Sequence, residues 1–534
     1  MTALLAATVP APSIEYSLLS PMLIVFGTAV IGVLVEAFAP RRSRYGIHLP
    51  LAIIGLAAAL VAVVWLSGTN ATAMVGAVAV DGVTLFLQGT ILVVSILGIV
   101  FIAERGAESR AQARSGPGTW SLTAARGGID AFTPQAASVP GSADEKAAVR
   151  AGIATTEVFP LTVLAVGGLL LFPASNDLLT MFVALEVLSL PLYLLCGLAR
   201  RKRLLSQEAA LKYFLLGAFS SAFFLYGVAL LYGQAATVRL GGIADAIATH
   251  PENTTLALLG VGMLAVGLLF KIGAVPFQSW VPDVYQGAPT AITGFMAAAT
   301  KIAAVGAMVR VLQIAVPGLR DDWRPVLAAV AIATMLVGAV MAITQTDVKR
   351  MLAYSSVAHA GFILTGLVAA NEAGVAAILF YLLAYGIGTL GAFAAVSLVR
   401  DANGDEATAL SQWAGLGRRS PWLATVFALF LLSFAGLPLT SGFVSKFAVF
   451  SAAAAGGVTY LVIVGVIASA IAAFFYIRVI VLMFFTDPPA DAPIIVTPAM
   501  TTTLIAVTSA ATLVLGILPQ PLLDLAKQAA TFTR

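Results

Sequence analysis

The sequence predicts an all-α membrane protein with about fourteen transmembrane helices. The chain has 534 residues, of which 60% are hydrophobic and only 10% are charged. Soluble domains carry roughly 25% charged residues, so this chain lacks the polar surface that water requires. Its apolar runs are continuous rather than alternating, and most approach the roughly 20 residues that a helix needs to cross a bilayer. These observations favour a helical bundle over a β-barrel.

Fourteen apolar runs can be placed along the chain. The fourth is short, and the twelfth and thirteenth are long enough to be tilted or broken. The runs are Leu18–Phe38, Leu49–Leu66, Val83–Ala103, Val158–Phe172, Leu178–Leu198, Leu211–Tyr232, Leu256–Pro276, Ile292–Val309, Pro325–Ile343, Met351–Leu367, Val375–Val399, Leu423–Phe450, Val458–Phe485 and Thr497–Leu518.

The basic residues predict the orientation of these helices. Eighteen lysines and arginines lie in loops that follow odd-numbered runs, and four lie in loops that follow even-numbered runs (Arg239, Arg310, Arg320 and Arg324). Cytoplasmic loops of membrane proteins carry the excess of basic residues. The odd loops are therefore expected in the cytoplasm and both termini on the outer side. Residues 1–12 contain no basic residue, so we expect no secretory signal peptide.

The runs divide the chain into five parts. Residues 1–103 hold three N-terminal helices, and residues 104–156 form a polar cytoplasmic insertion rich in Ala, Gly, Ser and charges. Residues 157–315 and 316–487 each hold five helices, and residues 488–534 hold the last helix and a tail. We expect the insertion to be a linker, although it is long enough to dock on a neighbouring subunit.

Six ionisable residues inside the apolar runs are candidates for function. A charge near mid-membrane costs several kcal/mol, so each needs a functional or structural reason. Lys212 lies close to the cytoplasmic end of its run and can also be explained by snorkelling. Glu186 and Lys446 can also be explained as a structural ion pair, and His359 as a packing residue. The six residues are Glu186, Lys212, Lys271, Lys301, His359 and Lys446.

Two of the runs that carry these charges are interrupted by proline. Pro276 follows Lys271 by five residues, and Pro438 precedes Lys446 by eight. Proline removes a helical hydrogen bond and leaves carbonyl groups free. The two prolines lie in the seventh and twelfth runs, five runs apart. Two inverted five-helix repeats with broken helices would place them in equivalent positions, which is a pattern typical of ion sites in transporters.

This set of residues predicts proton transfer. Removal from water disfavours the charged form of a lysine, which can then exchange a proton near neutral pH, and a carboxylate such as Glu186 modulates that exchange. A sodium site would need clustered oxygen ligands, which the runs do not supply. The sequence contains no nucleotide-binding glycine motif, and its single cysteine, Cys196, excludes an iron–sulfur cluster within this chain. We therefore expect no cofactor or metal in this chain, and no nucleic-acid binding despite its pI of about 9.1.

Several longer stretches resemble a known family. The segments PASNDLLTMFVALEVLSLPLYLL, FKIGAVPFQSWVPDVYQGAPTAITGFMAAATK, TQTDVKRMLAYSSVAHAGF and FAGLPLTSGFVSKF are similar to the antiporter-like subunits of the proton-pumping NADH:quinone oxidoreductase, complex I. They cover the fifth to twelfth runs. Within the family the chain resembles the N type most, because it ends soon after Leu518, without the lateral helix of the L type. It also has Lys446 where the M type typically has glutamate.

The resemblance implies roles for the six ionisable residues as members of a proton relay. Glu186 matches a glutamate thought to pair with a lysine, Lys271 and Lys446 match the lysines of the two broken helices, and Lys301 matches the lysine of the eighth span. Lys212 and His359 match further members of the polar axis. The chain departs from the family at Gln278, where histidine is common, and at residues 386–389, which replace a segment that often bears asparagine.

The resemblance also implies an assembly in the cell membrane of a bacterium. The expected partners are membrane lipid, an adjacent antiporter-like subunit M, small subunits such as K and, through them, the peripheral arm. NADH, FMN, iron–sulfur clusters and quinone would belong to other subunits, and quinone reduction there would drive proton transfer here. A D-type subunit of a multi-subunit Na⁺/H⁺ antiporter is the alternative, and a purely structural subunit is a third reading.

Overall fold

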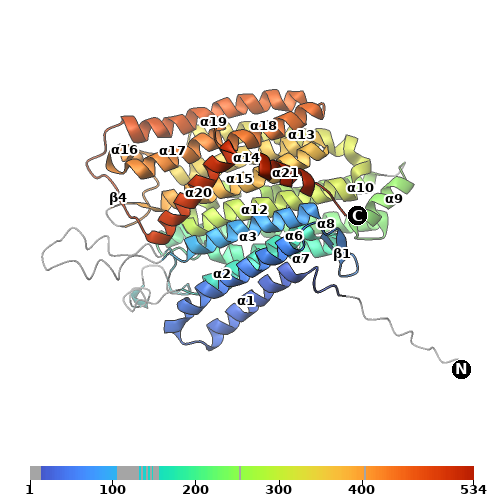
Figure 1. Ribbon diagram of the computed structural model, residues 1–534, viewed down its shortest axis with the longest axis horizontal. Coiled ribbons are helices and arrows are strands. Elements are labelled where there is room, and N and C mark those ends of the chain that lie inside the picture. Colours follow the sequence, from blue (N-terminus) through green and yellow to red (C-terminus); the bar gives the residue numbers. More distant parts are fainter. Residues whose placement is uncertain are drawn as a thin grey trace.

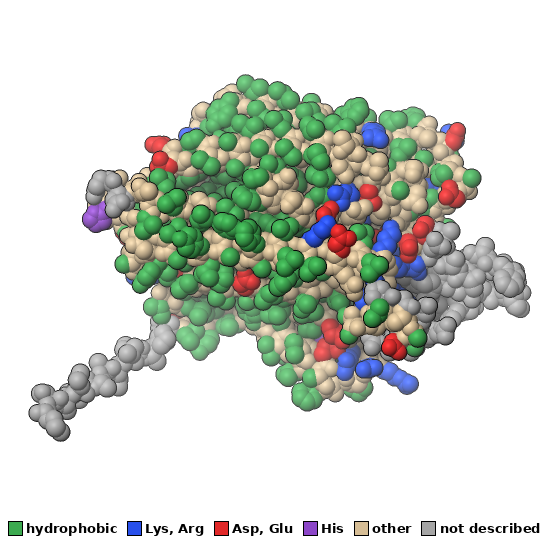
Figure 2. All heavy atoms as spheres, turned by 180° about the vertical axis from the view of Figure 1, so that it is seen from behind, with side chains coloured by type: hydrophobic (Ala, Val, Ile, Leu, Met, Phe, Trp, Pro, Cys, Tyr) green, Lys and Arg blue, Asp and Glu red, His purple; other side chains and the backbone are tan. Residues whose placement is uncertain are grey.

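The computed structural model describes residues 14–104, 155–251, 254–401 and 404–533, with short stretches at 131–133, 136–139, 142–144 and 147. Long helices lie side by side with their axes roughly aligned (Figure 1). Among the described residues, twelve helices are long and apolar enough to cross a membrane. Apolar side chains cover most of the face in Figure 2, and most charged side chains on that face gather toward one end.

The N-terminal part contains three long helices and a small hairpin. The hairpin lies between the second and third helices, and its two strands pair antiparallel, with Ala71 opposite Val80. These short strands were not expected from the apolar runs. The elements are α1 (Ser20–Phe38), α2 (Arg41–Trp65), β1 (Ala71–Ala73), β2 (Val78–Val80) and α3 (Gly82–Ile102).

The next part corresponds to the first expected five-helix unit. It contains one interrupted helix, α10 and α11, and a short amphipathic helix, α9, that the apolar runs did not predict. The elements are α6 (Val158–Ala174), α7 (Leu178–Cys196), α8 (Arg203–Ala235), α9 (Leu240–Thr249), α10 (Thr255–Ile272), α11 (Trp280–Gly287) and α12 (Thr290–Arg310), followed by the short turns η2 (Val311–Ala315) and η3 (Pro317–Leu319).

The last part contains the second expected unit, the final long helix and a second amphipathic helix that was not predicted, α21. Strands β3 and β4 pair antiparallel and join the loop after α15 to the loop before α20. The elements are α13 (Arg320–Ile343), α14 (Val348–Ala369), α15 (Glu372–Ser397), β3 (Val399–Arg400), η4 (Leu410–Trp413), α16 (Leu416–Arg419), α17 (Pro421–Ala435), α18 (Ser441–Ala455), α19 (Thr459–Phe485), β4 (Ile494–Ile495), α20 (Ala499–Ile517) and α21 (Gln520–Ala529).

Each predicted run overlaps a helix or, for the twelfth run, a pair of helices with a proline between them, although α2 and α8 begin eight residues before their runs. The short fourth run is α6, with 17 residues, and the long twelfth run is divided into α17 and α18, with 15 residues each. The thirteenth run is one continuous helix, α19. The membrane-protein class is therefore confirmed, while the count of fourteen spans and the two inverted repeats stay predictions.

The two helix interruptions begin with the same backbone motif. α10 ends at Gly273 and α17 ends at Gly436, and both glycines are left-handed, with φ of +79° and +86°. The next residue donates in each case to the carbonyl five residues back, Ala274 to Leu269 and Leu437 to Leu432. This is the Schellman arrangement, in which glycine avoids the steric cost of a left-handed conformation. The shared motif supports equivalent positions for the two breaks.

Both ends of the described chain lie beside the connection between α2 and α3. The Glu15 carboxylate accepts a hydrogen bond from the backbone of Met74, at 3.0 Å. At the other end, the backbone N–H of Thr533 donates to Asp81, also at 3.0 Å. The two described ends therefore lie at the same end of the bundle, as the even number of predicted spans requires.

The most buried helices are α12, α14 and α15. The most apolar stretches of α12 and α14 are 100% and 94% buried, whereas that of α20 is 28% buried. A polar side chain on α12 or α14 therefore has to find its partners inside the bundle. These two helices carry Lys301 and His359.

Only parts of the predicted 104–156 insertion belong to the described residues. The described parts pair with the connection between α7 and α8: Thr133 donates to the carbonyl of Leu198, and Arg200 donates to the carbonyl of Ala131, at 2.8 and 2.9 Å. Arg203 also reaches the carbonyls of Ala136 and Ser138. These stretches of the insertion are attached to the chain's own helices, and the rest lies outside the described residues.

Candidate functional site

Lys271 lies at the first helix interruption, in the last turn of α10. It is 3% exposed, and its Nζ lies 3.3 Å from the hydroxyl of Tyr213. The same nitrogen lies 5.4 Å from the ring centre of Tyr193 and 5.0 Å from that of Tyr213. Aromatic faces at this distance attract an ammonium group electrostatically. The lysine is thus held by a hydroxyl and two rings.

The aromatic residues beside Lys271 also connect the two helices on either side of the break, α10 and α11. Tyr213 stacks on Trp280, the first residue of α11, with ring centres 4.6 Å apart. The indole N–H of Trp280 donates to the carbonyl of Phe270, at 2.9 Å. Across the gap, the backbone N–H of Val275 donates to the hydroxyl of Thr334 on α13. The backbone at the break is therefore also bonded to side chains of α11 and α13.

Lys301 lies in the middle of α12 and is 3% exposed. Its Nζ donates to the hydroxyl of Ser356 on α14, at 2.7 Å, and to the backbone carbonyl of the same residue. The nitrogen also lies 5.1 Å from the ring centre of Tyr385 on α15. The side chains of Tyr285 and Tyr385 interact with Ser356 as well. Lys301 thus lies where α12, α14 and α15 converge.

His359 lies between Lys301 and the second helix interruption. Its Nδ1 is 2.7 Å from the hydroxyl of Tyr381, and its ring packs against Tyr385 and Phe434, with centres 4.8 and 5.5 Å apart. Its Nε2 has no hydrogen-bond partner among the described residues. A small cavity of about 10 Å³ adjoins the ring and reaches Ser433, Ser441 and Ser445, which flank the second interruption. This space is near the lower limit for one water molecule.

Lys446 lies beside the second interruption, in α18, and is 5% exposed. Its Nζ donates to the carbonyl of Ala435, the last residue of α17, at 3.0 Å, and to the hydroxyl of Ser469 on α19, at 2.6 Å. The ring centre of Phe362 lies 4.5 Å from the same nitrogen. A carbonyl at the end of the broken helix is thus used to bind the amine.

These side chains form a continuous series through the bundle. Lys271 contacts Tyr213, which stacks on Trp280. The ring centres of Trp280 and Tyr285 lie 6.3 Å apart. The series then continues through Ser356 to Lys301, Tyr385, His359, Phe362 and Lys446. Four of the six predicted residues, Lys271, Lys301, His359 and Lys446, are therefore brought together in one buried line.

Glu186 lies next to this line without a close cationic partner. The residue is partly buried in α7, and its Oε1 has no hydrogen-bond partner among the described residues. The charge of Glu186 acts on Lys271 and on Tyr193. Among the described residues, however, no cationic side chain lies within 4.0 Å of the Glu186 carboxylate, the limit for an ion pair. Its predicted pairing with lysine is therefore electrostatic at longer range in this structure.

Lys212 lies in a different environment from the other lysines. Its side chain is 42% exposed and makes ion pairs with Glu208, at 2.7 Å, and with Asp283 of α11, at 2.8 Å. Arg350 of α14 shares the same Asp283, at 2.7 Å. Lys212 therefore belongs to a partly exposed ionic cluster next to Tyr213, outside the buried line.

Sequence reasoning missed a second buried lysine site, centred on Lys349. This residue had been counted with the loops, but Asp347 caps the N-terminus of α14 and places Lys349 in its first turn, where it is 2% exposed. Its Nζ donates to the carbonyl of Ala288 and the hydroxyl of Thr290, both at 3.0 Å, and reaches Glu406 at 3.5 Å. An acidic cap in front of an apolar run was the signal that could have revealed it.

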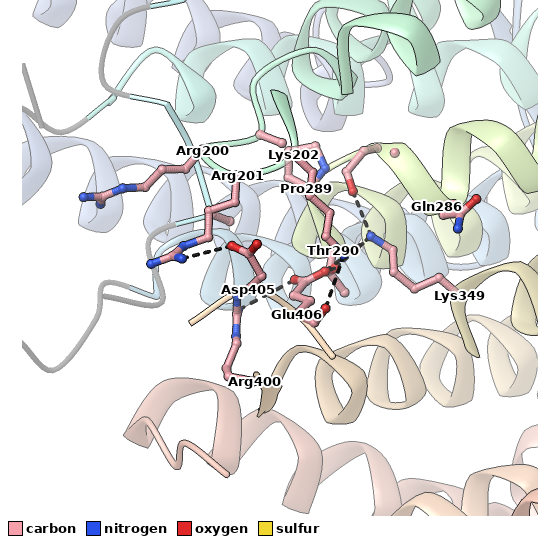
Figure 3. Close-up of a pocket in the computed structure, with 14 residues that line it drawn as sticks. Arg200, Arg201, Lys202, Gln286, Pro289, Thr290, Lys349, Arg400, Asp405 and Glu406 are labelled. Atoms are coloured by element: carbon pink, nitrogen blue, oxygen red, sulfur yellow. Dashed lines mark hydrogen bonds and ion pairs between the residues drawn. The ribbon is translucent and has the colours of Figure 1, made fainter. Parts of the chain in front are cut away.

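Glu406 is the acidic centre of this second site (Figure 3). Its carboxylate accepts from Thr290 at 2.5 Å and lies 3.7 Å from Arg400. Burial alone would raise the pKa of Glu406, but the charges of Lys349 and Arg400 and the hydrogen bond from Thr290 outweigh it and hold the pKa below its usual range. The group is therefore ionised at neutral pH.

A third site that was not predicted is a fully buried ion pair at the opposite end of α12. Arg310 ends this helix and binds Asp81, the N-cap of α3, with both side chains 0% exposed. The guanidinium also donates to Thr84 and to the carbonyl of Pro173 in α6, at 2.7 and 2.8 Å. The pair joins three helices and, through Thr533, the C-terminal tail.

No group of three or more His, Cys, Asp or Glu side chains with suitable geometry occurs in the part of the chain that the structure describes. The single cysteine, Cys196, is fully buried and its thiol is free. The arrangement is suited to holding and passing protons between amines, hydroxyls and an imidazole.

Residues 175–472 match the family described as "NADH:quinone oxidoreductase/Mrp antiporter, TM". The chain is 71% identical to NADH-quinone oxidoreductase subunit N of Rhodococcus opacus, over 99% of this chain and 98% of the relative. It is 62% identical to the subunit of the same name from Mycobacterium tuberculosis strain H37Rv, over 98% of this chain and 99% of that one.

Two solved structures have the same fold. A chain of respiratory complex I from Thermus thermophilus with bound aureothin superposes with a TM-score of 0.74 and 31% identity, over 95% of this chain and 99% of that chain. A chain of the Mrp complex from Dietzia sp. DQ12-45-1b gives a TM-score of 0.77 and 22% identity, over 97% of each chain. The second likeness concerns the fold alone.

Proposed function

Because the chain belongs to the family of NADH-quinone oxidoreductase subunit N proteins, we propose that it translocates protons through its buried line of lysines and histidine. It is a membrane subunit of NADH-quinone oxidoreductase, an oxidoreductase and proton translocase. The observation that carries the relay is the placement of Lys271, Lys301, His359 and Lys446 in one continuous series that includes both helix interruptions.

The three lysines of this series suit reversible protonation. Among the described residues, their amines are bound by hydroxyls, backbone carbonyls and aromatic faces, and no carboxylate lies within 4.0 Å of them. A lysine without a bound counterion can lose its proton without leaving a buried carboxylate unpaired. Glu186 acts on Lys271 from a greater distance, so movement of either group would change the proton affinity of the lysine.

In this proposal, redox chemistry takes place in other subunits. NADH, FMN, iron–sulfur clusters and quinone would be bound there, and the energy of quinone reduction would reach this chain through adjacent membrane subunits such as M and K. The chain would lie in the plasma membrane of a bacterium, with the basic loops in the cytoplasm and both termini outside. Lys212, in its exposed ionic cluster, would lie at the cytoplasmic edge of the relay.

A second function has some support from the fold. The likeness to a chain of the Mrp complex is consistent with a D-type subunit of a multi-subunit Na⁺/H⁺ antiporter. The full-length identity of 71% to subunit N of Rhodococcus opacus favours the redox complex.

Comigration on a native gel separates the two functions. The chain would carry a small tag, the membranes would be extracted in mild detergent, and the gel would be stained for NADH-dependent dye reduction. We expect the tag and the activity in one very large complex. A tag that runs in a smaller assembly without this activity would refute the proposal and favour the antiporter.

A further inference from the structure

Lys349 and Glu406 lie on the side of the bundle where the basic loops gather, away from the line of Lys271, Lys301 and Lys446. The pocket around them has a volume of about 50 Å³ and is lined by residues 199–202, residues 286–290, Arg400, Asp405 and Glu406, together with Ala131 and Lys349. Figure 3 shows that Lys349 enters from the start of α14 and points toward Thr290 and Glu406. The pocket is large enough for a few water molecules.

Exposure decreases stepwise from the rim of this pocket to Lys349. The side chains of Arg201 and Asp405, which form an ion pair at 2.9 Å, are each 29% exposed. Glu406 is 19% exposed, and the side chain of Lys349 is 3% exposed. Water can therefore reach the carboxylate, while the amine behind it is shielded by the protein.

The contacts of Lys349 differ from those of a simple structural ion pair. Its nitrogen is closer to the carbonyl of Ala288 and the hydroxyl of Thr290, both at 3.0 Å, than to the carboxylate of Glu406, at 3.5 Å. The carboxylate is bound more closely by Thr290, at 2.5 Å. The amine can thus release a proton while the carboxylate keeps the hydrogen bond from Thr290 and the nearby charge of Arg400.

The same two helices carry the next lysine toward the membrane interior. Lys349 of α14 binds Thr290 of α12, and Lys301 of α12 binds Ser356 of α14. Ser356 follows Lys349 by seven residues, which places both on one face of α14, about 10 Å apart along the axis. Tyr285 interacts with Ser356 and belongs to α11, just before the carbonyl of Ala288 that Lys349 binds.

We propose that Lys349, with Glu406 in front of it, is the point at which protons from the cytoplasmic side reach Lys301. This inference rests on the proposed function and on the orientation given there. In the step, an N–H bond of the Lys349 ammonium breaks and the proton passes inward to water or to the hydroxyls around Ser356. A proton from solvent, passed by the Glu406 carboxylate, then bonds to the amine. No electron is transferred.

The test compares two substitutions of one residue in the assembled complex. Arginine keeps the positive charge and hydrogen bonds toward Glu406 but does not release a proton in proteins, and methionine removes both. If Lys349 conducts protons, Lys349→Met and Lys349→Arg should both lower the initial rate of NADH-driven proton uptake into vesicles at least about threefold. The Glu406→Gln variant should lower it in the same direction. If Lys349 only holds the loops together, Lys349→Arg should behave like the unsubstituted protein.

Controls separate a failure of this inference from a failure of the proposed function. Lys527→Met removes a lysine whose side chain is 64% exposed on α21, and it should leave proton uptake unchanged. Lys301→Met should abolish translocation through this subunit if the proposed function holds. A normal rate in Lys349→Arg together with a loss in Lys301→Met would overturn the proton-uptake role of Lys349 alone. Normal rates in both variants would overturn the proposed function as well. Native gels establish whether each variant is assembled. If the Lys349→Met variant does not assemble, the comparison rests on the Lys349→Arg variant.

Discussion

At the residue scale, the buried cations of this protein fall into two groups. Among the described residues, Lys271, Lys301 and Lys446 are bound by neutral acceptors and aromatic rings, without a carboxylate at ion-pair distance. Arg310 is instead bound to Asp81 at 2.7 Å, with both side chains fully buried. The first group can change its charge without leaving a bound carboxylate unpaired, whereas the second group loses a strong pair if either partner changes.

The Asp81–Arg310 pair should contribute strongly to stability. Asp81→Asn leaves the charge of Arg310 buried without a counterion, so we expect the free energy of unfolding to fall by about 3 to 5 kcal/mol. Thermal melting of the solubilised complex, read as loss of this subunit on native gels, measures the effect. Asp524→Asn is the control, because its ion pair with Lys527 lies on the surface and should contribute at most about 1 kcal/mol. Equal melting temperatures for both variants would contradict this account.

The same pair should give a defined pH dependence. Burial alone would raise the pKa of Asp81, but the charge and hydrogen bonds of Arg310 outweigh it and hold the pKa below its usual range. A carboxyl whose pKa is lower in the folded state stabilises the fold above its unfolded pKa, near 4, and loses this effect as the pH falls through the folded value. The difference in melting temperature between the native chain and Asp81→Asn should therefore persist from pH 8 to pH 5 and shrink only below about pH 4.

At the element scale, the two helix interruptions lie beside Lys271 and Lys446, and the second one also supplies a backbone acceptor. At the second one, the carbonyl of Ala435 is free because α17 ends there, and it accepts from Lys446. Gly436 makes this possible in two ways: its φ is +86°, and a Cβ at this position would lie 2.9 Å from Cδ of Lys446. The glycine therefore sets the backbone turn and the position of the amine together.

Substituting alanine at two left-handed glycines separates the effect on the backbone turn from the effect on the position of the Lys446 amine. Gly436→Ala and Gly457→Ala both force alanine into a left-handed conformation, at a cost of about 1 to 2 kcal/mol. At Gly457, with φ +77°, a Cβ would meet nothing within 4 Å, whereas at Gly436 it would displace Lys446. We expect similar losses of thermal stability but a lower proton uptake rate only for Gly436→Ala. Equal uptake rates in the two variants would show that the position of Lys446 is not critical.

At the scale of the whole molecule, the orientation in the membrane decides which end takes up protons. The described N- and C-terminal ends both lie beside the connection between α2 and α3, at one end of the bundle. The basic pocket of Figure 3 belongs to the loops that the charge distribution places in the cytoplasm. Proton uptake through Lys349 therefore requires the described chain ends to lie outside the cytoplasm.

Thiol labelling tests this orientation. The native Cys196 is fully buried and should not react, so it gives a silent background. Asp524→Cys on α21 should react with a membrane-impermeant maleimide in intact cells. Asp487→Cys, at a position that is 84% exposed in the loop after α19, should react only after the cells are permeabilised. The reverse pattern would invert the proposed orientation.

The sequence by itself determined the class of the protein and predicted four residues that the structure brings together in one buried line. Backbone groups in a bilayer must be hydrogen-bonded within helices, so the helices are visible as apolar runs in the sequence. A buried charge is costly, so lysines inside these runs are visible as exceptions to the pattern. Pro276 and Pro438 likewise act on their own backbone, and the two helix interruptions were predicted from them without a structure. The longer segments around Lys271 and Lys301 indicated the protein family.

The tertiary structure alone decided which charged groups are buried and what they contact. It placed Lys212 in a partly exposed ionic cluster, Lys349 inside the bundle, and Arg310 against Asp81, 229 residues earlier in the chain. Burial and pairing arise from contacts between distant segments, and such contacts leave no periodic trace in the sequence. For the same reason, the aromatic series from Tyr213 to Phe362, which joins the lysines into one line, became visible only when the helices were packed.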